Sequence, residues 1–142
     1  MNAFSRNARV AAYQSASVHG GVAAADPHGL ILMLMNAAIE RLTMARACLD
    51  RGEIVTKTKL LHSCVNLIAE LRGVLNLNEG GSLAQNLSDL YDYMMRRVLR
   101  GNAENDPQCL TEVLSLLGEI RSAWVAIAPE VQQGAKRVAP AA

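Results

Sequence analysis

The chain has 142 residues, a formal net charge of +1, 51% hydrophobic residues and 4% aromatic residues. This length suits one domain with a substantial core, and the scarcity of aromatic residues favours helices packed through Leu, Ala, Met and Val over a β-sandwich or barrel. A nearly neutral chain has no bulk electrostatic attraction for nucleic acids or anionic membranes.

The first predicted helix begins in ADPHGL, where Asp26 can cap free backbone amides and Pro27 suits the first helical position. It extends to about Leu49. Its segment LILMLMNAAIERL, residues 30–42, spreads apolar side chains over roughly twice the ~100° arc that packing on one core requires. We therefore expect that something besides the core covers this helix.

The second predicted helix runs from about Glu53 to Leu75 and has an apolar face made of every third or fourth residue. This face contains Leu60, Cys64, Leu67, Leu71 and Val74, and it is widened by Leu61, Val65 and Ile68. The opposite side carries the polar residues Lys59, His62, Asn66 and Glu70.

A loop, NLNEGG, is expected to precede the third helix, which begins at Ser82 with the capping-box pattern SLAQ and continues to about Arg100. Its predicted inward face is Leu83, Leu87, Leu90, Met94 and Val98. After the loop GNAEN, Asp106 and Pro107 repeat the start signal of the first helix. The fourth helix is expected to end before Pro129. It buries Leu110, Val113, Leu117, Ile120 and Trp124.

Short loops between long amphipathic helices predict antiparallel neighbours, so the expected fold is all-α, an antiparallel up-down four-helix bundle over residues 26–128. We expect an extended N-terminal arm at residues 1–25 and a mobile C-terminal tail at residues 129–142. No apolar run reaches the length of a membrane span, and the N-terminus lacks the pattern of a secretory signal. Three widely spaced Cys in apolar contexts indicate buried reduced thiols. A cytoplasmic location without membrane insertion follows.

Catalytic and cofactor motifs are not recognisable in the chain. His19, His28 and His62 have no metal-ligand spacing, no Glu-x-x-His motif of a di-iron bundle occurs, and the Gly-Gly pairs follow no strand. We predict a protein that is not an enzyme and needs no metal or cofactor.

The segment NLSDLYDYMMRRVLRGN, residues 86–102, carries more specific information. Helical geometry places Tyr91 at the edge of the buried face and Tyr93 on the polar side, between Arg96 and Arg97. Tyr93 is either a surface aromatic stacked on an arginine or a contact to a protein partner. Acidic residues on the same surface and the lack of interleaved aromatic residues argue against nucleic acid.

LYDYMMRRVLRGN resembles the signature of the FliS family of flagellar export chaperones. The family's opening helix resembles the segment DPHGLILMLMNAAIERLTMA. The passage from its second to its third helix resembles AELRGVLNLNEGGSLAQNLSDLYDYM. Its last helix, which carries a Trp, resembles LLGEIRSAW. Tyr13 stands where the family carries a Tyr in the N-terminal arm. The resemblance covers about residues 10–127, in order.

This resemblance implies a cytoplasmic chaperone that binds the disordered C-terminal region of flagellin in hydrophobic grooves, prevents premature polymerisation and aids delivery to the flagellar type III export gate. It also allows a regulatory adaptor that binds an anti-sigma factor or a co-chaperone. A self-assembling helical homodimer is the alternative from a different class. The residues predicted to contact the client are Tyr13, Met33, Met44, Leu61, Val65, Ile68, Tyr93, Met95 and Arg97.

The arm at residues 1–25 is predicted to act as a lid on the excess apolar surface, with Tyr13 as its anchor. An uncovered apolar surface invites self-association, and a tethered segment has a high effective concentration. The alternative is an inert, disordered arm.

Overall fold

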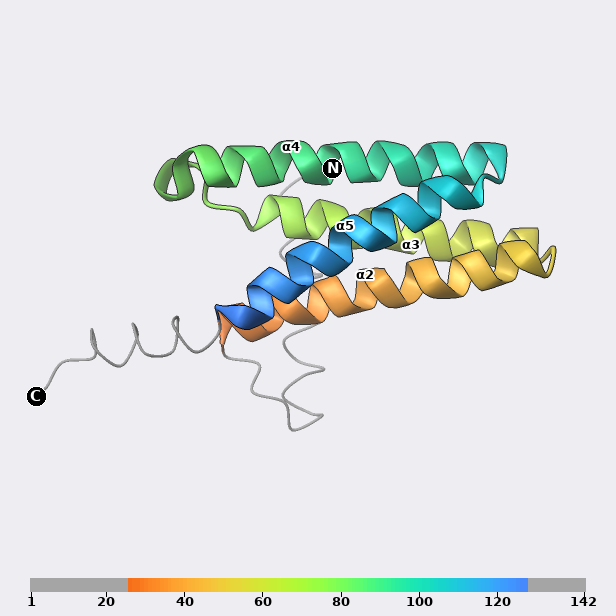
Figure 1. Ribbon diagram of the computed structural model, residues 1–142, viewed down its shortest axis with the longest axis horizontal. Coiled ribbons are helices and arrows are strands. Elements are labelled where there is room, and N and C mark those ends of the chain that lie inside the picture. The colour runs from red at the N-terminus through yellow and green to blue at the C-terminus, as the bar shows by residue number, and fades with distance from the viewer. Residues whose placement is uncertain (1–25, 128–142) are drawn as a thin grey trace, which may run out of the picture.

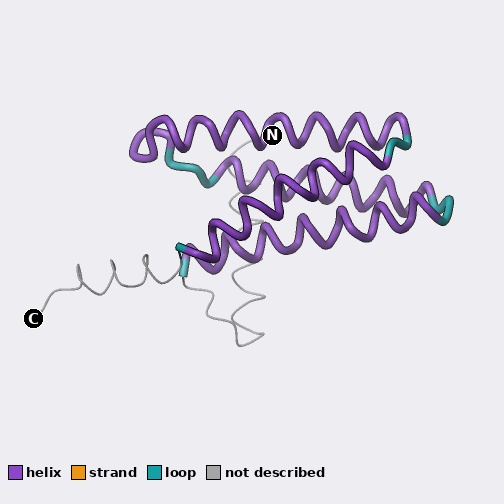
Figure 2. The backbone as a smooth tube through the Cα atoms, viewed as in Figure 1, coloured by secondary structure: helices purple, strands orange, loops and turns teal. Residues whose placement is uncertain are grey.

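The computed structural model describes residues 26–127 as α-helices joined by short loops (Figure 2). The helices are α2 (Pro27–Asp50), α3 (Ile54–Gly73), α4 (Leu77–Glu104) and α5 (Pro107–Ala126). This part of the chain contains no strand, and the predicted all-α four-helix bundle is confirmed.

The helices pack in a closed ring, α2 against α3, α3 against α4, α4 against α5, and α5 against α2. Consecutive helices run in opposite directions, as their short connections require. Figure 1 shows α5 crossing the bundle obliquely, from the end of α4 to the start of α2. The helices α4 and α5 therefore diverge toward the end of the bundle where α2 begins.

Two of the predicted helix starts have the expected caps. The side chain of Asp26 accepts a hydrogen bond from the backbone N–H of His28 at 3.0 Å, and Asp106 accepts one from Gln108 at 2.9 Å. In both helices a Pro follows the cap, where its missing N–H costs nothing.

The helix α4 extends beyond both of its predicted ends, although its backbone does break at Gly81, directly before the predicted start at Ser82. The expected NLNEGG loop is largely helical, because Asn76 caps an earlier start by accepting from the N–H of Glu79, and the backbone breaks only at Gly81 with φ 58°. The predicted capping box at Ser82 is not formed, and Gln85 instead donates to Asp89. At the other end the helix continues to Glu104 and stops where Asn105 turns left-handed.

The core contains most of the predicted inward residues from all four helices. Leu83 is an exception, with 69% of its surface exposed, because α5 diverges from this part of α4. Glu70, expected on the polar side of α3, is buried. The helix α3 contacts both α2 and α4, so its buried arc is wider than one apolar face and reaches Glu70.

Lys57 is the other buried charged residue of α3 within the described chain. Its Nζ donates to the carbonyl oxygen of Asn102 at 3.0 Å and to Oδ1 of Asn105 at 2.6 Å. Burial lowers the pKa of this ammonium group. The two bonds tie the start of α3 to the end of α4.

Gly101 lies where α4 passes close to the start of α5. A Cβ at this position would stand 2.9 Å from Cβ of Cys109 and 3.2 Å from Cδ2 of Leu110. We expect Gly101→Ala to lower the free energy of unfolding by about 1–3 kcal/mol, because the two helices must separate. Gly118→Ala, in open space on α5, is the control and should add about 0.4–1 kcal/mol. Urea unfolding measures both, and equal effects of the two substitutions would contradict the close contact.

Stability should fall at alkaline pH. Burial raises the pKa of Cys64 and of Tyr91 to about 12, from 9.0 and 10.0 in the unfolded chain. The folded state holds these two protons more tightly than the unfolded chain does. The stability that the two groups contribute is therefore complete below their pKa values in the unfolded chain, and it is lost as the pH rises toward 12. Between pH 10 and 11, the Tyr91→Phe variant should therefore lose less unfolding free energy than the wild type does. Parallel curves for the variant and the wild type would exclude a buried phenol as the cause.

Candidate protein-binding surface

An apolar hollow of about 240 Å³ opens at the end of the bundle where α4 and α5 diverge. We call it the end groove. Its lining comes from the start of α2, the end of α3, the start of α4 and the end of α5: Ile31, Val74, Leu75, Asn76, Gly80, Leu83, Ala84, Leu87 and Trp124. It is almost entirely apolar, which is the chemistry of a surface that binds apolar side chains.

The end groove lies directly over a smaller cavity of about 70 Å³ that reaches the core. The two spaces share Ile31, Val74, Leu75, Leu87 and Trp124. The deeper one is also bounded by Met35, Leu71, Tyr91 and Ile120. The groove therefore has depth, and a side chain entering it would contact the core.

His28 and Trp124 form a clasp that closes one side of the end groove. Their rings stack with centroids 4.2 Å apart and planes 7° from parallel. Nε2 of His28 lies 2.8 Å from the carbonyl oxygen of Trp124, and Nε1 of Trp124 donates to the carbonyl oxygen of His28 at 3.0 Å. Because a carbonyl only accepts, Nε2 is the protonated nitrogen of His28. The clasp fastens the end of α5 to the start of α2, away from α4.

Exposed apolar side chains occur in the end groove and on the helix ends that form it. Val74 and Leu83 line the groove, Leu77 lies at the start of α4, and Val125 and Ile127 lie at the end of α5. Exposed apolar residues gathered at one place on a monomer are typical of a protein-interaction site, whereas scattered ones need no explanation.

A second hollow, of about 450 Å³, lies along the seam between α3 and α4, and we call it the seam groove. It is lined by Ala69, Arg72, Gly73, Leu75, Leu77, Ser88 and Met95. Leu75 lines both hollows, so the two form adjoining parts of one surface.

The structure distributes the predicted contact residues unevenly over these surfaces. Met95 lines the seam groove. Val65 is half-buried against the core, Met33 is half-buried on α2, and Met44 is exposed on the same helix. Tyr13 lies outside the described residues.

Leu61 and Ile68, also predicted as contacts, are fully buried in the core and present no surface in this conformation. The wide apolar face of α3 explains their burial, because it packs between two neighbouring helices. Sequence periodicity shows that such a residue lies on an apolar helix face, but it does not show whether that face is in the core or on the surface.

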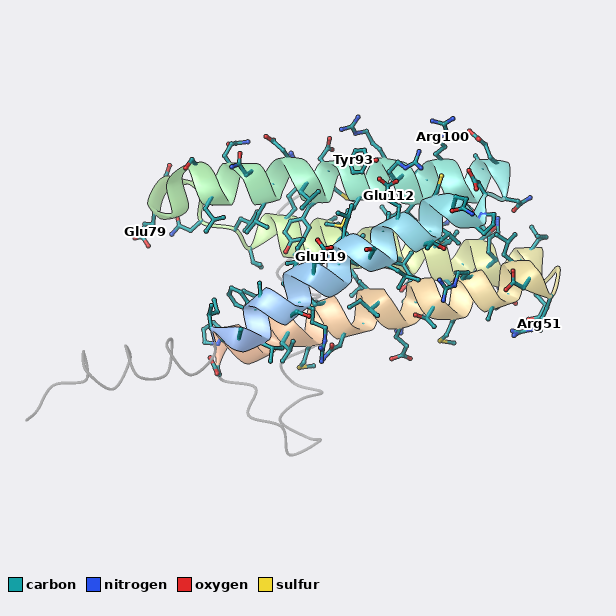
Figure 3. All side chains as sticks on the ribbon, viewed as in Figure 1. Arg51, Glu79, Tyr93, Arg100, Glu112 and Glu119 are labelled. Atoms are coloured by element: carbon teal, nitrogen blue, oxygen red, sulfur yellow. The ribbon has the colours of Figure 1, made fainter. Side chains whose placement is uncertain are left out.

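Tyr93 and Arg97 take part in an internal polar contact between α4 and α5. Tyr93 Oη donates to Oε2 of Glu112 at 2.6 Å, and Arg97 Nε donates to Oε1 at 2.7 Å. Figure 3 shows Tyr93 on α4 beside Glu112 on α5. The hydrogen bond raises the pKa of the Tyr93 phenol and lowers that of the Glu112 carboxyl. Tyr93 is thus half-buried and paired with a carboxylate, and its contact with a partner stays a prediction.

Sequence reasoning missed the residues that form the end groove. It assigned Leu83, Leu87 and Trp124 to the core; Leu87 and Trp124 do pack against the core, but they and exposed Leu83 also line an open hollow. The signal that could have revealed the groove is Gly80-Gly81, since a break in α4 changes which residues its neighbours cover.

Metal and membrane sites can be assessed for the described residues. Between residues 26 and 127 no three His, Cys, Asp or Glu side chains are grouped closely enough to hold a metal ion. No helix in that range is long and apolar enough to cross a membrane. Cys48, Cys64 and Cys109 are free and buried, as predicted.

Known proteins resemble this chain over most of its length. The family model described as "Flagellar protein FliS" matches residues 9–131. The flagellar secretion chaperone FliS of Salmonella typhimurium is 43% identical over 122 residues, which cover 85% of this chain and 90% of the relative. That of Vibrio cholerae is 41% identical over 119 residues, 84% of this chain and 88% of the relative. Flagellar secretion chaperone FliSB of Pseudomonas aeruginosa is 41% identical over 112 residues, which cover 79% of this chain and 89% of the relative.

The clasp predicts that His28 stabilises the bundle while an exposed histidine does not. His28→Ala should lower the unfolding free energy by about 1–3 kcal/mol, because it removes a stacked ring and leaves the Trp124 carbonyl without its donor. His62→Ala, on the exposed side of α3, should change it by less than about 0.5 kcal/mol. Trp124 is the single tryptophan of the chain, so its fluorescence monitors unfolding in both variants. Equal stabilities would show that the clasp is dispensable.

Proposed function

Because the chain belongs to the FliS family of flagellar secretion chaperones, we propose that it binds the disordered C-terminal region of flagellin in the cytoplasm. In this proposal the bound client cannot polymerise prematurely and is delivered to the flagellar export gate. The observation that carries the proposal is the open, apolar end groove, which has the chemistry to hold the apolar face of a client helix.

The physical basis is helix-in-groove recognition. An amphipathic client segment places side chains at positions i, i+3, i+4 and i+7 into an apolar hollow. Each buried aliphatic side chain contributes roughly 1.5–3 kcal/mol, and the ordering of the segment offsets most of the sum. The net affinity is then moderate, which suits a client that must be released. Nothing in this binding and release requires catalysis or a cofactor.

The N-terminal arm has a place in the same proposal. Residues 1–25 are tethered to Asp26, at the start of α2 and therefore next to the end groove. The tether gives the arm a high local concentration at this site, so weak contacts suffice to cover it until the client arrives. Tyr13 is the anchor we propose.

A second partner is the other candidate. Toward the opposite end of the bundle, Met44, Ile54, Val55 and Leu99 are exposed large apolar side chains. These favour an additional protein contact, which would be an anti-sigma factor, a co-chaperone or a second copy of this chain.

Leu83 and Val55 provide a matched test of the end groove. Their exposures are 69% and 71%, but Leu83 lines the groove and Val55 lies at the other end of the bundle. We expect Leu83→Ser to weaken binding of a flagellin C-terminal peptide about tenfold, and Val55→Ser to leave it unchanged. Calorimetric titration of the purified full-length chain measures both.

Neither substitution should change stability by more than about 0.5 kcal/mol, since both side chains are exposed. Equal affinities for the two variants would contradict the end groove as the client site. A wild-type protein that binds no flagellin peptide, but elutes as a stable dimer, would favour the homodimer instead.

A further inference from the structure

The seam groove contains a charged side chain in a lining of mixed apolar and polar surface. Arg72 lies in the last turn of α3, and its neighbours in the lining are mainly apolar: Ala69, Leu75, Leu77 and Met95. Its side chain is 43% exposed, so a partner that covers this hollow must also cover the guanidinium group.

The internal partners of Arg72 leave much of its charge uncompensated. Nε donates to the hydroxyl oxygen of Ser88 at 2.9 Å, and this partner is neutral. The nearest carboxylate oxygen, Oδ1 of Asp92, lies 3.9 Å from Nη1, which is too far for a hydrogen bond. The other oxygen of Asp92 accepts from Nε of Arg96 at 3.1 Å. One carboxylate therefore serves two guanidinium groups.

Asp92 is the acidic residue that pairs with Arg72 in the described structure. Asp89, one turn before Asp92 on α4, accepts from the amide of Gln85 and forms no ion pair with Arg72 in the described structure. The C-terminal end of α3 contributes only the partial charge of its free carbonyl groups. The seam groove thus holds a guanidinium group among both apolar and polar lining atoms, and Arg72 is the charged residue of its lining.

We infer that Arg72 is a specificity residue of the seam groove, where its guanidinium group receives a carboxylate from the amphipathic client segment that docks there. The inference rests on the proposed chaperone function and assigns a chemical requirement to the client: one Asp or Glu next to its apolar side chains.

The requirement follows from desolvation. When an apolar segment covers the groove, water leaves the Nη groups, and a charged group without a new partner is costly. A carboxylate replaces the lost water with two parallel hydrogen bonds, because the planar guanidinium fork matches its geometry. A segment without an acidic residue at this position leaves the desolvated guanidinium group without a partner, so it binds with lower affinity.

The test compares Arg72→Met with Arg100→Met in the full-length chain. Methionine retains the apolar stem of the arginine side chain and removes its charge. Arg100 is the control because it carries the same charge on α4, pairs with Glu104 and points away from the bundle (Figure 3). The probes are labelled peptides from the C-terminal region of flagellin, in which each Asp or Glu is replaced in turn by its amide. Fluorescence anisotropy gives the dissociation constants.

Arg72→Met should weaken binding about tenfold and Arg100→Met less than about twofold, as expected for loss of a charge-assisted hydrogen bond. One amide substitution in the peptide should weaken binding to the wild type to the same extent and have no further effect on Arg72→Met, because the two partners form one interaction. Urea unfolding verifies that both variants are folded.

Unchanged affinity of folded Arg72→Met, or losses that simply add for every peptide substitution, would overturn the inference while the proposed function stands. A folded wild-type protein that binds none of the peptides would overturn the proposed function, and this inference with it.

Discussion

The oblique path of α5 determines the shape of the whole molecule. Near its start, α5 touches α4 at Gly101, where the space left by the missing side chain admits Cys109 and Leu110. At its end, α5 is fastened to α2 by the stacked and doubly hydrogen-bonded pair of His28 and Trp124. A helix held to different neighbours at its two ends must diverge from one of them, and here it leaves the first turns of α4 uncovered.

The end groove is a direct consequence of this divergence. Leu83 and Leu87 have the spacing of core residues, but Leu83 is exposed and Leu87 is only partly buried, so they form one wall of a hollow. Gly81 contributes by interrupting α4 just before this wall. The cavity below the groove indicates that the four helices are not fully packed at this end. An unfilled apolar space costs stability, and a protein retains one most readily where a partner fills it.

Several polar contacts join neighbouring helices in the described part of the chain. Lys57 joins the start of α3 to the end of α4, Glu112 joins α4 to α5 through Tyr93 and Arg97, and Arg72 reaches from α3 to Ser88 on α4. Each of these contacts is directional, whereas burial of Leu and Met is not. They therefore help to hold the helices in register. The chain that these contacts hold together belongs to a family of flagellar secretion chaperones.

The sequence by itself determined the four helices, two of their caps and most of the core, because these depend on local signals: Asp-Pro at a helix start and apolar residues at helical spacing. The family was also evident from the chain alone, since its motifs lie in consecutive order. Only the tertiary structure decided which apolar residues are core and which are surface. Leu61 and Leu83 are both leucines on apolar helix faces, yet one is fully buried and the other is the most exposed leucine of the described chain. Periodicity gives the direction of a side chain relative to its own helix, but burial depends on where the neighbouring helices lie, and the crossing of α5 is set by contacts between residues far apart in the sequence.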